Sequence, residues 1–324
     1  MTKKDLRIVF MGTPDFAVPS LEALLKKKYN IIGVITSPDK PAGRGLKIRQ
    51  PAVKQFAEKN NLRKILQPIN LKDPVFIQEL KYLMPDLQVV VAFRMLPDDV
   101  WQIPRYGTFN LHASLLPHYR GAAPINRVII NGENITGVTT FFIEHDIDTG
   151  KIILQEEVEI EKNENAGELH DKLMIEGAKL VCKTVDAIEN DSFKLTDQLK
   201  LFTKGQDLKK APKIHKEDCK INWNKEPVEI FNFIRGLSPY PTAWTEIISE
   251  SGKKITLKIF ASDYSISDHD LNPGEILSDQ RTFLKIAVNK GFINVNNLQL
   301  EGKKRMNIED FLRGFKSISK YKFL

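Results

Sequence analysis

Short apolar runs that alternate with helical segments constrain the fold of this chain more than any other feature of its sequence. Residues 7–10, 31–35 and 89–93 are short runs dominated by apolar and β-branched residues, a pattern that is typical of strands buried on both faces of a sheet. Residues 17–27 lie between the first two runs and carry Leu21, Leu24 and Leu25 at helical spacing. We therefore expect the N-terminal part to form an α/β fold with a doubly wound, mostly parallel sheet.

The pattern changes after residue 190. Further strands are expected at residues 108–112, 137–143 and 151–160, and a long amphipathic helix at 166–190. Residues 191–215 are then polar and rich in lysine, and a helix is expected at 227–237. Short β-rich runs separated by turn signals follow at residues 244–248, 255–261, 274–277, 283–288 and 293–300. Five such runs suggest a small β-barrel, similar to the oligonucleotide-binding (OB) type.

A chain of 324 residues is long for one hydrophobic core, so we expect separate domains. Residues 1–190 are assigned to the first domain, 191–215 to a linker and 216–324 to a C-terminal barrel domain. Residues 201–324 carry 21 Lys and Arg against 15 Asp and Glu, whereas residues 1–200 carry 27 against 26. This asymmetry favours an anionic partner such as RNA for the C-terminal part, although a merely Lys-rich surface accounts for it equally well.

Several common kinds of site are missing from the sequence. The turn at residues 12–16 has a single glycine, so it lacks the dinucleotide fingerprint, and no P-loop motif occurs. Cys182 and Cys219 lack the spacing of a zinc site or a disulfide framework, and no metal is expected. The N-terminus lacks a signal-peptide pattern, and no stretch approaches about 18 apolar residues. We therefore expect a cytoplasmic protein without a membrane partner.

Polar residues gather at the ends of two expected strands. The segment NLHASLLP begins at Asn110, and because His112 lies two residues further, both side chains share one face of a strand. The segment DIDTG, with Asp146 and Asp148, follows the strand expected at residues 137–143. Ligands of open α/β sheets bind beyond the carboxyl ends of the strands, so both segments lie where a site is expected.

These residue types suit acyl transfer without a covalent enzyme intermediate. When an amine attacks a formyl carbon, the side-chain amide of Asn110 can donate to the oxyanion that forms. His112 can move the proton, and Asp148 can orient the imidazole and favour its charged form. An Asn-x-His pair on a strand is more often structural, so the residues alone leave that alternative open. His118 and His145 are expected to be surface groups or to support the site from behind the residues that contact ligands.

Together with the segment RGAAP at residues 120–124, this pattern resembles the signature of the folate-dependent formyltransferases. The resemblance implies that Asn110, His112 and Asp148 are the catalytic trio and that 10-formyltetrahydrofolate is the co-substrate. It also implies folate contacts at Phe93, Met95, Ser114, Leu115, Leu116, Pro117 and Asp146. Residues 92–97, however, depart from the family pattern of an aromatic residue followed by glycine, and this segment is one residue shorter.

The resemblance extends over essentially the whole chain to the family members that act on methionyl-tRNA. It includes the opening segment, the loop at residues 37–45 and residues 237–244. The prolines and glycines of the loop predict an irregular backbone, and its positive charge is concentrated at Lys40, Arg44, Lys47 and Arg49. The resemblance implies formyl transfer to the amino group of methionyl initiator tRNA, with the RNA bound by these four residues and by the barrel. We expect the protein to be a monomer.

Three other activities stay open from the residues. A formyltransferase for sugar nucleotides would share the trio but would need neither the basic loop nor a basic barrel. A tRNA-binding module without catalysis would not need Asn110, His112 and Asp148. A hydrolase of formylfolate would use water in place of the amine, and the sequence does not distinguish trace hydrolysis from transfer.

Overall fold

The computed structural model describes residues 5–42, 47–201, 207–316 and 318–324, and it divides into two compact units. The first unit consists of residues 1–121, 136–158 and 170–210, and the second of residues 122–135, 159–169 and 211–324. Neither unit is one continuous stretch of chain. The expected linker is shared between them, because residues 191–210 belong to the first unit and residues 211–215 to the second.

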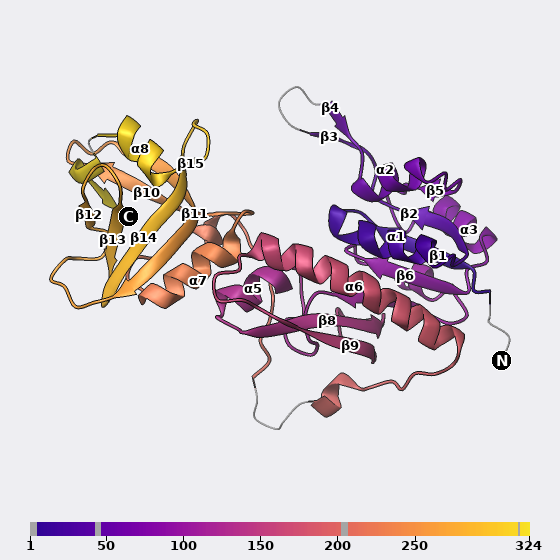
Figure 1. Cartoon of the computed structure of the whole chain (residues 1–324). Helices are drawn as coiled ribbons and strands as arrows, with labels where there is room; N and C mark the ends of the chain where they lie inside the picture. Colours follow the sequence, from indigo (N-terminus) through magenta and orange to yellow (C-terminus); the bar gives the residue numbers. More distant parts are fainter. Residues whose placement is uncertain (1–4, 43–46, 202–206, 317) are drawn as a thin grey trace. The chain divides into compact units, whose positions relative to one another are not determined.

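The first unit is built on a seven-stranded sheet in the order β5-β2-β1-β6-β7-β8-β9 (Figure 1). Its strands are β1 (Ile8–Gly12), β2 (Ile31–Ile35), β5 (Ile65–Leu66), β6 (Leu87–Val91), β7 (Thr108–His112), β8 (Ile135–Phe142) and β9 (Ile152–Glu159). The first five pair in parallel, and β8 runs antiparallel to β7. Every residue of β1 and β6 is buried. The predicted mostly parallel α/β sheet is confirmed.

Helices cover both faces of this sheet. Val90 shares a core with Phe76 of α3 on one face. Asn110 pairs with Val90, so its neighbour Leu111 points to the other face, where it lies against Gly177 of α6. The helices of the first unit, with α6 extending into the second, are η1 (Asp15–Ala17), α1 (Val18–Lys26), α2 (Ala52–Lys59), α3 (Pro74–Tyr82), α4 (Asp98–Trp101), α6 (Ala166–Glu189) and η2 (Gln198–Leu201).

Two predicted strand boundaries are wrong. The strand predicted at residues 89–93 is β6 and ends at Val91, because Ala92 adopts a φ of 47°, which an extended strand does not allow. The strand predicted at residues 255–261 is the first half of β11 (Lys254–Ile266). This strand continues because β14 (Gly291–Leu300) pairs with it over most of its length, past a register irregularity near Ala261.

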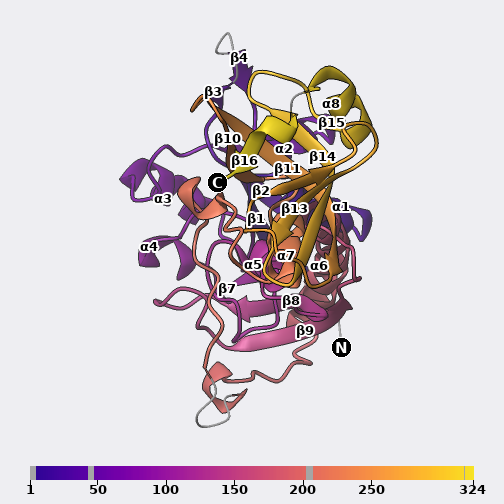
Figure 2. The same ribbon diagram turned by 90° about the vertical axis from the view of Figure 1, so that its left-hand side faces the viewer.

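The second unit is built on an antiparallel sheet in the order β12-β13-β14-β11-β10-β16, with β15 paired to β14 (Figures 1 and 2). Besides β11, its strands are β10 (Ala243–Ser249), β12 (Ile276–Ser278), β13 (Leu284–Val288), β14 (Gly291–Leu300), β15 (Met306–Asn307) and β16 (Tyr321–Phe323). The backbone N–H of Phe323 donates to the Gly274 carbonyl, just before β12, at 3.0 Å. The sheet therefore nearly closes on itself, and the predicted barrel is confirmed, with two more strands than expected among the described residues.

Helix α7 (Pro227–Leu237) shows how the sequence builds this unit. Glu226 and Glu229 form a reciprocal capping box at its start, which satisfies backbone N–H groups that the first turn leaves free. Ile230, Ile234 and Leu237 recur at helical spacing and are buried in the barrel core. The other helices of this unit are α5 (Pro124–Ile130), η3 (Glu217–Cys219), α8 (Ile308–Gly314) and η4 (Ile318–Lys320).

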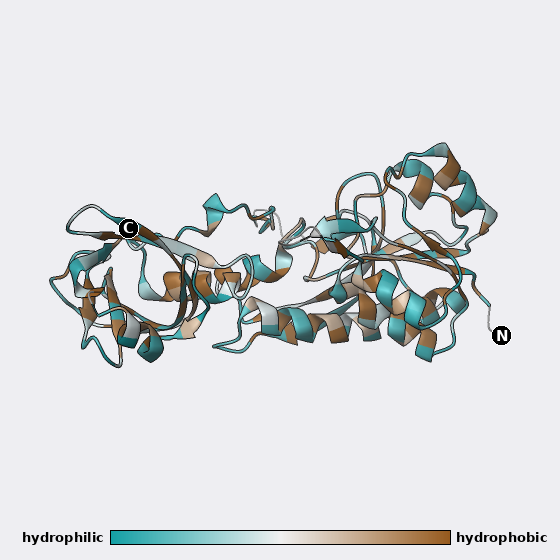
Figure 3. Cartoon of the chain, turned by 90° about the horizontal axis from the view of Figure 1, so that it is seen from above, coloured by the Kyte–Doolittle hydropathy of each residue, from teal (hydrophilic) through white to brown (hydrophobic). Residues whose placement is uncertain are grey.

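The longest helix, α6, alternates between hydrophilic and hydrophobic residues along its ribbon (Figure 3). No helix in the described ranges is both long enough and apolar enough to cross a membrane.

A close backbone approach between two strands of the first unit predicts a stability effect. A Cβ atom at Gly137 in β8 would lie 2.2 Å from the carbonyl oxygen of Glu156 and 2.5 Å from Leu115. We expect Gly137→Ala to lower the free energy of unfolding by about 1–3 kcal/mol, the usual effect of overpacking. Gly314→Ala is the control, because nothing lies within 4 Å of a Cβ there. Urea denaturation of both variants checks this, and equal midpoints for Gly137→Ala and wild type would contradict it.

Candidate active site and nucleic-acid interface

Strand β7 brings Asn110 and His112 to one face of the sheet. Asn110 is half-buried, and His112 is only 6% exposed. Because Asn110 pairs with Val90, both polar side chains lie on the sheet face that α3 covers. No described residue forms a hydrogen bond with the side-chain amide of Asn110, so that amide is free to contact a ligand.

The imidazole of His112 is held in one orientation by the backbone. Its Nε2 lies 2.9 Å from the carbonyl oxygen of Tyr119. A carbonyl oxygen only accepts hydrogen bonds, so Nε2 carries a hydrogen and donates it to Tyr119. In the neutral ring the lone pair is therefore on Nδ1, and this atom lies 3.7 Å from Oδ2 of Asp148. That separation is longer than a hydrogen bond, and the pair becomes an ion pair when Nδ1 takes up a proton.

Asp148 reaches this position from the loop between β8 and β9. Its backbone has a φ of 56°, a conformation that Asp adopts more readily than most residues. The same oxygen that faces His112, Oδ2, also accepts a hydrogen bond from the backbone N–H of Gly121 at 2.9 Å. The structure thus brings together two of the sequence-predicted residues, which lie 36 positions apart in the chain.

The segment that follows β7 is fixed by buried polar groups. Ser114 Oγ donates to the carbonyl of His118 at 2.9 Å, and Thr139 Oγ1 donates to the carbonyl of Ser114 at 2.6 Å. Gln155 Nε2 donates to the carbonyl of Leu116 at 2.9 Å. Ser114, Leu116 and Pro117 are buried, whereas Leu115 is half-buried. The side chains of Ser114 and Leu116 face the interior of the unit, so their predicted folate contacts would involve the backbone.

The other predicted folate contacts lie in two different environments. Phe93 is half-buried against the core beside α3, whereas Met95 is 75% exposed and Asp146 is exposed. Between the first two, Arg94 donates to the carbonyls of Pro68 and Ile69 at 2.7 and 2.9 Å. Burial lowers the pKa of the Arg94 guanidinium. The segment that departs from the family pattern therefore ties two loops together through this arginine.

Two further histidines lie near these segments. His145 is exposed, and its Nδ1 lies 3.5 Å from Asp98. His118 is half-buried and accepts a hydrogen bond from the backbone N–H of Lys209 at 3.4 Å.

No group of His, Cys, Asp or Glu side chains suited to hold a metal ion occurs in the described ranges. Both cysteines are buried and unpaired, and burial raises the pKa of the Cys182 and Cys219 thiols.

The basic loop is more regular than predicted. Residues 37–45 were expected to be irregular, but β3 (Lys40–Ala42) pairs antiparallel with β4 (Lys47–Arg49). A two-stranded ribbon tolerates Pro41 because an edge strand can leave one side of its backbone unpaired. Lys40 and Arg49 lie directly opposite each other and are exposed. Arg44 and the side chain of Lys47 lie outside the described residues.

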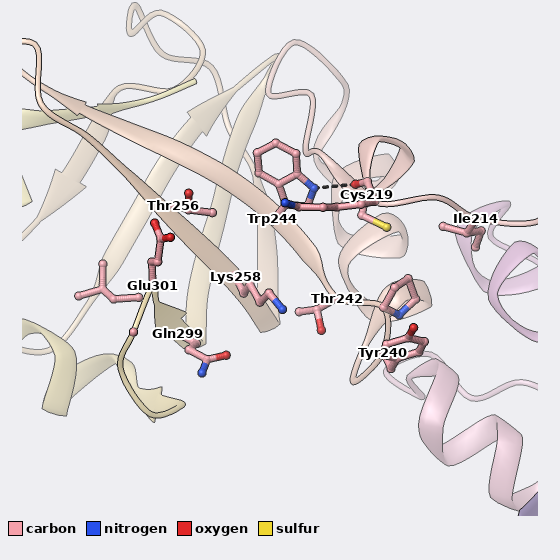
Figure 4. Close-up of a pocket in the computed structure, with 13 residues that line it drawn as sticks. Ile214, Cys219, Tyr240, Thr242, Trp244, Thr256, Lys258, Gln299 and Glu301 are labelled. Carbon is pink, nitrogen blue, oxygen red and sulfur yellow. Dashed lines mark hydrogen bonds between the residues drawn. The ribbon is translucent and has the colours of Figure 1, made fainter. Parts of the chain in front are cut away.

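A cavity of about 540 Å³ opens on the outer face of the barrel (Figure 4). Trp244, Lys258 and Gln299 stand side by side across β10, β11 and β14. Tyr240 at its rim is 83% exposed. The remaining lining residues are Ile214, Lys216, Cys219, Pro241, Thr242, Thr256, Leu300, Glu301 and Gly302.

The indole of Trp244 is fixed within this lining. Its Nε1–H donates to the carbonyl of Lys216 at 2.8 Å, and Lys220 Nζ lies 5.6 Å from the ring centroid. Aromatic rings and lysines arranged on a barrel face are typical of surfaces that bind single-stranded nucleic acid. Sequence reasoning missed this cavity, because only the register of the paired strands brings Trp244, Lys258 and Gln299 side by side.

Comparison with known proteins covers both units. Residues 6–185 match the formyl transferase family, and residues 213–316 match the C-terminal domain of formyl transferases. The methionyl-tRNA formyltransferase of Bacteroides thetaiotaomicron is 54% identical over 322 residues, which are 99% of this chain and 99% of the relative. The methionyl-tRNA formyltransferase of Phocaeicola vulgatus is 56% identical over 318 residues, 98% of each chain.

Solved structures share the fold at lower identity. An N-formyltransferase from Helicobacter canadensis, solved with folinic acid and dTDP-3-aminofucose, has a TM-score of 0.63 and 22% identity, covering 93% of this chain and 100% of its own. HypX from Aquifex aeolicus, solved with tetrahydrofolic acid, has a TM-score of 0.59 and 17% identity, covering 95% of this chain and 47% of its own. The family matches in both parts and the full-length identity above 50% place the chain: it belongs to the formyl transferase family, in its methionyl-tRNA formyltransferase branch.

Proposed function

We propose that this enzyme transfers the formyl group of 10-formyltetrahydrofolate to the α-amino group of methionyl initiator tRNA. The observation that carries the proposal is the identity above 50% over nearly the whole length to methionyl-tRNA formyltransferases. The buried, oriented imidazole of His112 beside Asp148 supports the same chemistry. One chain supplies every group that the proposal needs, so we expect a monomer to be active.

In the proposed reaction the amine nitrogen attacks the formyl carbon, and the carbonyl oxygen becomes an oxyanion. The amide of Asn110, which no described residue engages, donates to that oxygen. The amine loses its proton to Nδ1 of His112, where the carboxylate of Asp148 stabilises the charge. The bond from the formyl carbon to N10 of the folate then breaks, and the proton passes to N10. His112 thus acts first as a base and then as an acid.

We also propose that the pterin end of the folate contacts Phe93, Met95 and Asp146. The folate also contacts the backbone of the segment after β7 in this proposal. Leu115 is the half-buried side chain of that segment, so it is the one that can pack on a ligand. The side chains of Ser114, Leu116 and Pro117 would support the backbone from within.

The RNA is proposed to bind the β3–β4 hairpin and the barrel. Like charges that face each other across a strand pair destabilise it, and Lys40 faces Arg49. A phosphate between them would offset this repulsion. Lys47 and Arg44 add to the same charge, and Arg44 lies between two glycines, where a long side chain can enter a narrow site. On the barrel, we propose that Tyr240 and Trp244 stack on unpaired bases while Lys258 neutralises phosphate.

Three parallel reactions test this function. The purified enzyme and 10-formyltetrahydrofolate are incubated with charged methionyl initiator tRNA, with an amino-sugar nucleotide, or with no acceptor. We expect formylmethionyl-tRNA to form and the other two reactions to be slow. Formylation of the sugar nucleotide alone would contradict the proposal, and release of formate without an acceptor would identify a hydrolase instead.

Asn110→Ala is expected to lower kcat about 10²–10³-fold, because it removes one donor to the oxyanion. The Kd for folate should stay within error, since the amide acts on charge that develops only in the transition state. Asn134→Ala is the control, because Asn134 is exposed and lies outside the site. Steady-state kinetics with charged tRNA give kcat and KM, and an effect confined to KM would contradict the oxyanion role.

Asp148 is expected to act through His112. His112→Ala should lower kcat about 10²–10⁴-fold, the usual contribution of a proton-transfer group. Asp148→Ala should lower kcat by a smaller factor, and the kcat of the double variant should be no lower than that of His112→Ala. The comparison of all four enzymes forms a double-mutant cycle. Losses that multiply would show that the two residues work separately.

Tyr240→Ala is expected to lower kcat/KM for charged tRNA by an amount equivalent to about 1–3 kcal/mol, the contribution of one stacked base. Tyr240→Phe keeps the ring and should behave as wild type. The Kd for folate should not change in either variant, because the cavity is in the barrel. Wild-type kcat/KM in Tyr240→Ala would show that this cavity does not bind RNA, while leaving the reaction itself unaffected.

A further inference from the structure

Gln198 lies in the segment that the sequence suggested to be a linker, but it is a buried part of the first unit. It begins the short helix η2 and is 1% exposed. The residues just before it are attached to the sheet, because Thr196 and Ile152 exchange two backbone hydrogen bonds of 2.9 Å. A buried polar side chain is costly unless it is hydrogen-bonded, so its partners indicate why a glutamine stands here.

The amide of Gln198 is fully hydrogen-bonded within the protein. Its Nε2 donates to the carbonyl of Asp148 at 3.0 Å and to the carbonyl of Gly150 at 2.7 Å. Its Oε1 accepts from Nε and Nη2 of Arg120 at 3.0 and 2.6 Å. Two donors and two acceptor sites are all that a glutamine amide offers. Gln198 therefore has no hydrogen-bonding capacity left for a substrate.

These four contacts join the two segments that meet at the candidate site. Arg120 precedes Gly121, whose N–H holds Oδ2 of Asp148. The carbonyls of Asp148 and Gly150 belong to the loop that carries the carboxylate. The loop includes a residue with positive φ, a conformation that persists when its surroundings fix it. The same amide thus holds both the backbone behind Asp148 and the side chain beside Gly121.

We propose that Gln198 is a positioning residue for formyl transfer, which holds the Asp148 carboxylate beside His112 by bridging Arg120 to the loop at residues 148–150. The proposal rests on the role proposed above for Asp148. The amide of Gln198 has no hydrogen bond left to offer a substrate, so its effect should appear in kcat and not in binding. A mutation that does not touch the reacting atoms can still slow an enzyme about 10²-fold when it misplaces a group that acts on them by about 1 Å.

Two substitutions separate the contacts. Gln198→Met keeps the length of the side chain but removes all four hydrogen bonds. Gln198→Glu keeps an acceptor for Arg120 and removes both donors to the loop. We expect kcat with charged tRNA to fall about 10–100-fold in both, while KM for each substrate changes less than about twofold. Gln102→Met, at an exposed glutamine, is the control. If Gln198→Glu retained wild-type kcat, the donors to the loop would not matter and the proposal would be overturned.

A double-mutant cycle distinguishes positioning from a loss of folding. In an Asp148→Ala background, the carboxylate that Gln198 positions is absent, so Gln198→Met should lower kcat by less than about threefold. The proposal would be overturned if the kcat of the double variant fell by the product of the two single losses in kcat. It would also be overturned if the fall in kcat of Gln198→Met were accounted for by the fraction of unfolded protein that circular dichroism measures. Wild-type activity on tRNA is measured in the same experiment. Its absence would refute the proposed function, whereas an active wild type with an unaffected Gln198→Met would refute only this inference.

Discussion

The hydrogen bond between His112 Nε2 and the carbonyl oxygen of Tyr119 is the contact on which the proposed chemistry depends. It decides which ring nitrogen carries the hydrogen in the neutral imidazole and leaves Nδ1 facing Asp148. For the bond to form, the chain must turn back on itself within seven residues of β7. The turn is held by Ser114, whose hydroxyl donates to His118, and it brings Gly121 to the Asp148 carboxylate.

Buried polar groups fix the two segments that form the site. Thr139, Gln155 and Gln198 each donate to backbone carbonyls of the two segments that form it. Such groups are costly when unpaired and directional when paired, so they fix positions more narrowly than hydrophobic contacts do. Arg120 is part of this arrangement: burial lowers the pKa of its guanidinium, and the charge of Asp148 opposes that shift.

The cations proposed for RNA differ from those of the site in their surroundings. Arg120 is partly buried and bonded to Gln198, and Arg94 is bonded to two backbone carbonyls. Lys40, Arg49 and Lys258 are exposed instead. Exposed cations attract phosphate over a distance and are screened by salt. Half-buried arginines therefore hold the loops of this chain, and the cations that we propose for RNA are exposed ones.

The sequence alone predicted most of the secondary structure, because apolar periodicity reports burial directly. The strand at residues 108–112 and the helix at residues 227–237 agree with β7 and α7. The prediction of an irregular loop at residues 37–45 was wrong, because proline and glycine show only which backbone conformations a residue allows. Lys40 lies in a strand because a second strand pairs with it at Arg49. The end of β6 was missed because nothing in the residue type of Ala92 indicates a positive φ.

For the site, the sequence by itself determined that Asn110 and His112 share one face of a strand, since neighbours on a strand alternate by geometry alone. The position of Asp148 just after an expected strand suggested its carboxylate, and the resemblance to formyltransferases implied its role. Only the tertiary structure decided that Oδ2 of Asp148 faces Nδ1 of His112, and that Gln198, 50 residues further along the chain, holds the loop in place. Contacts between such distant residues depend on how sheet, turn and connecting segment fold against one another, and no local pattern of residues records that arrangement.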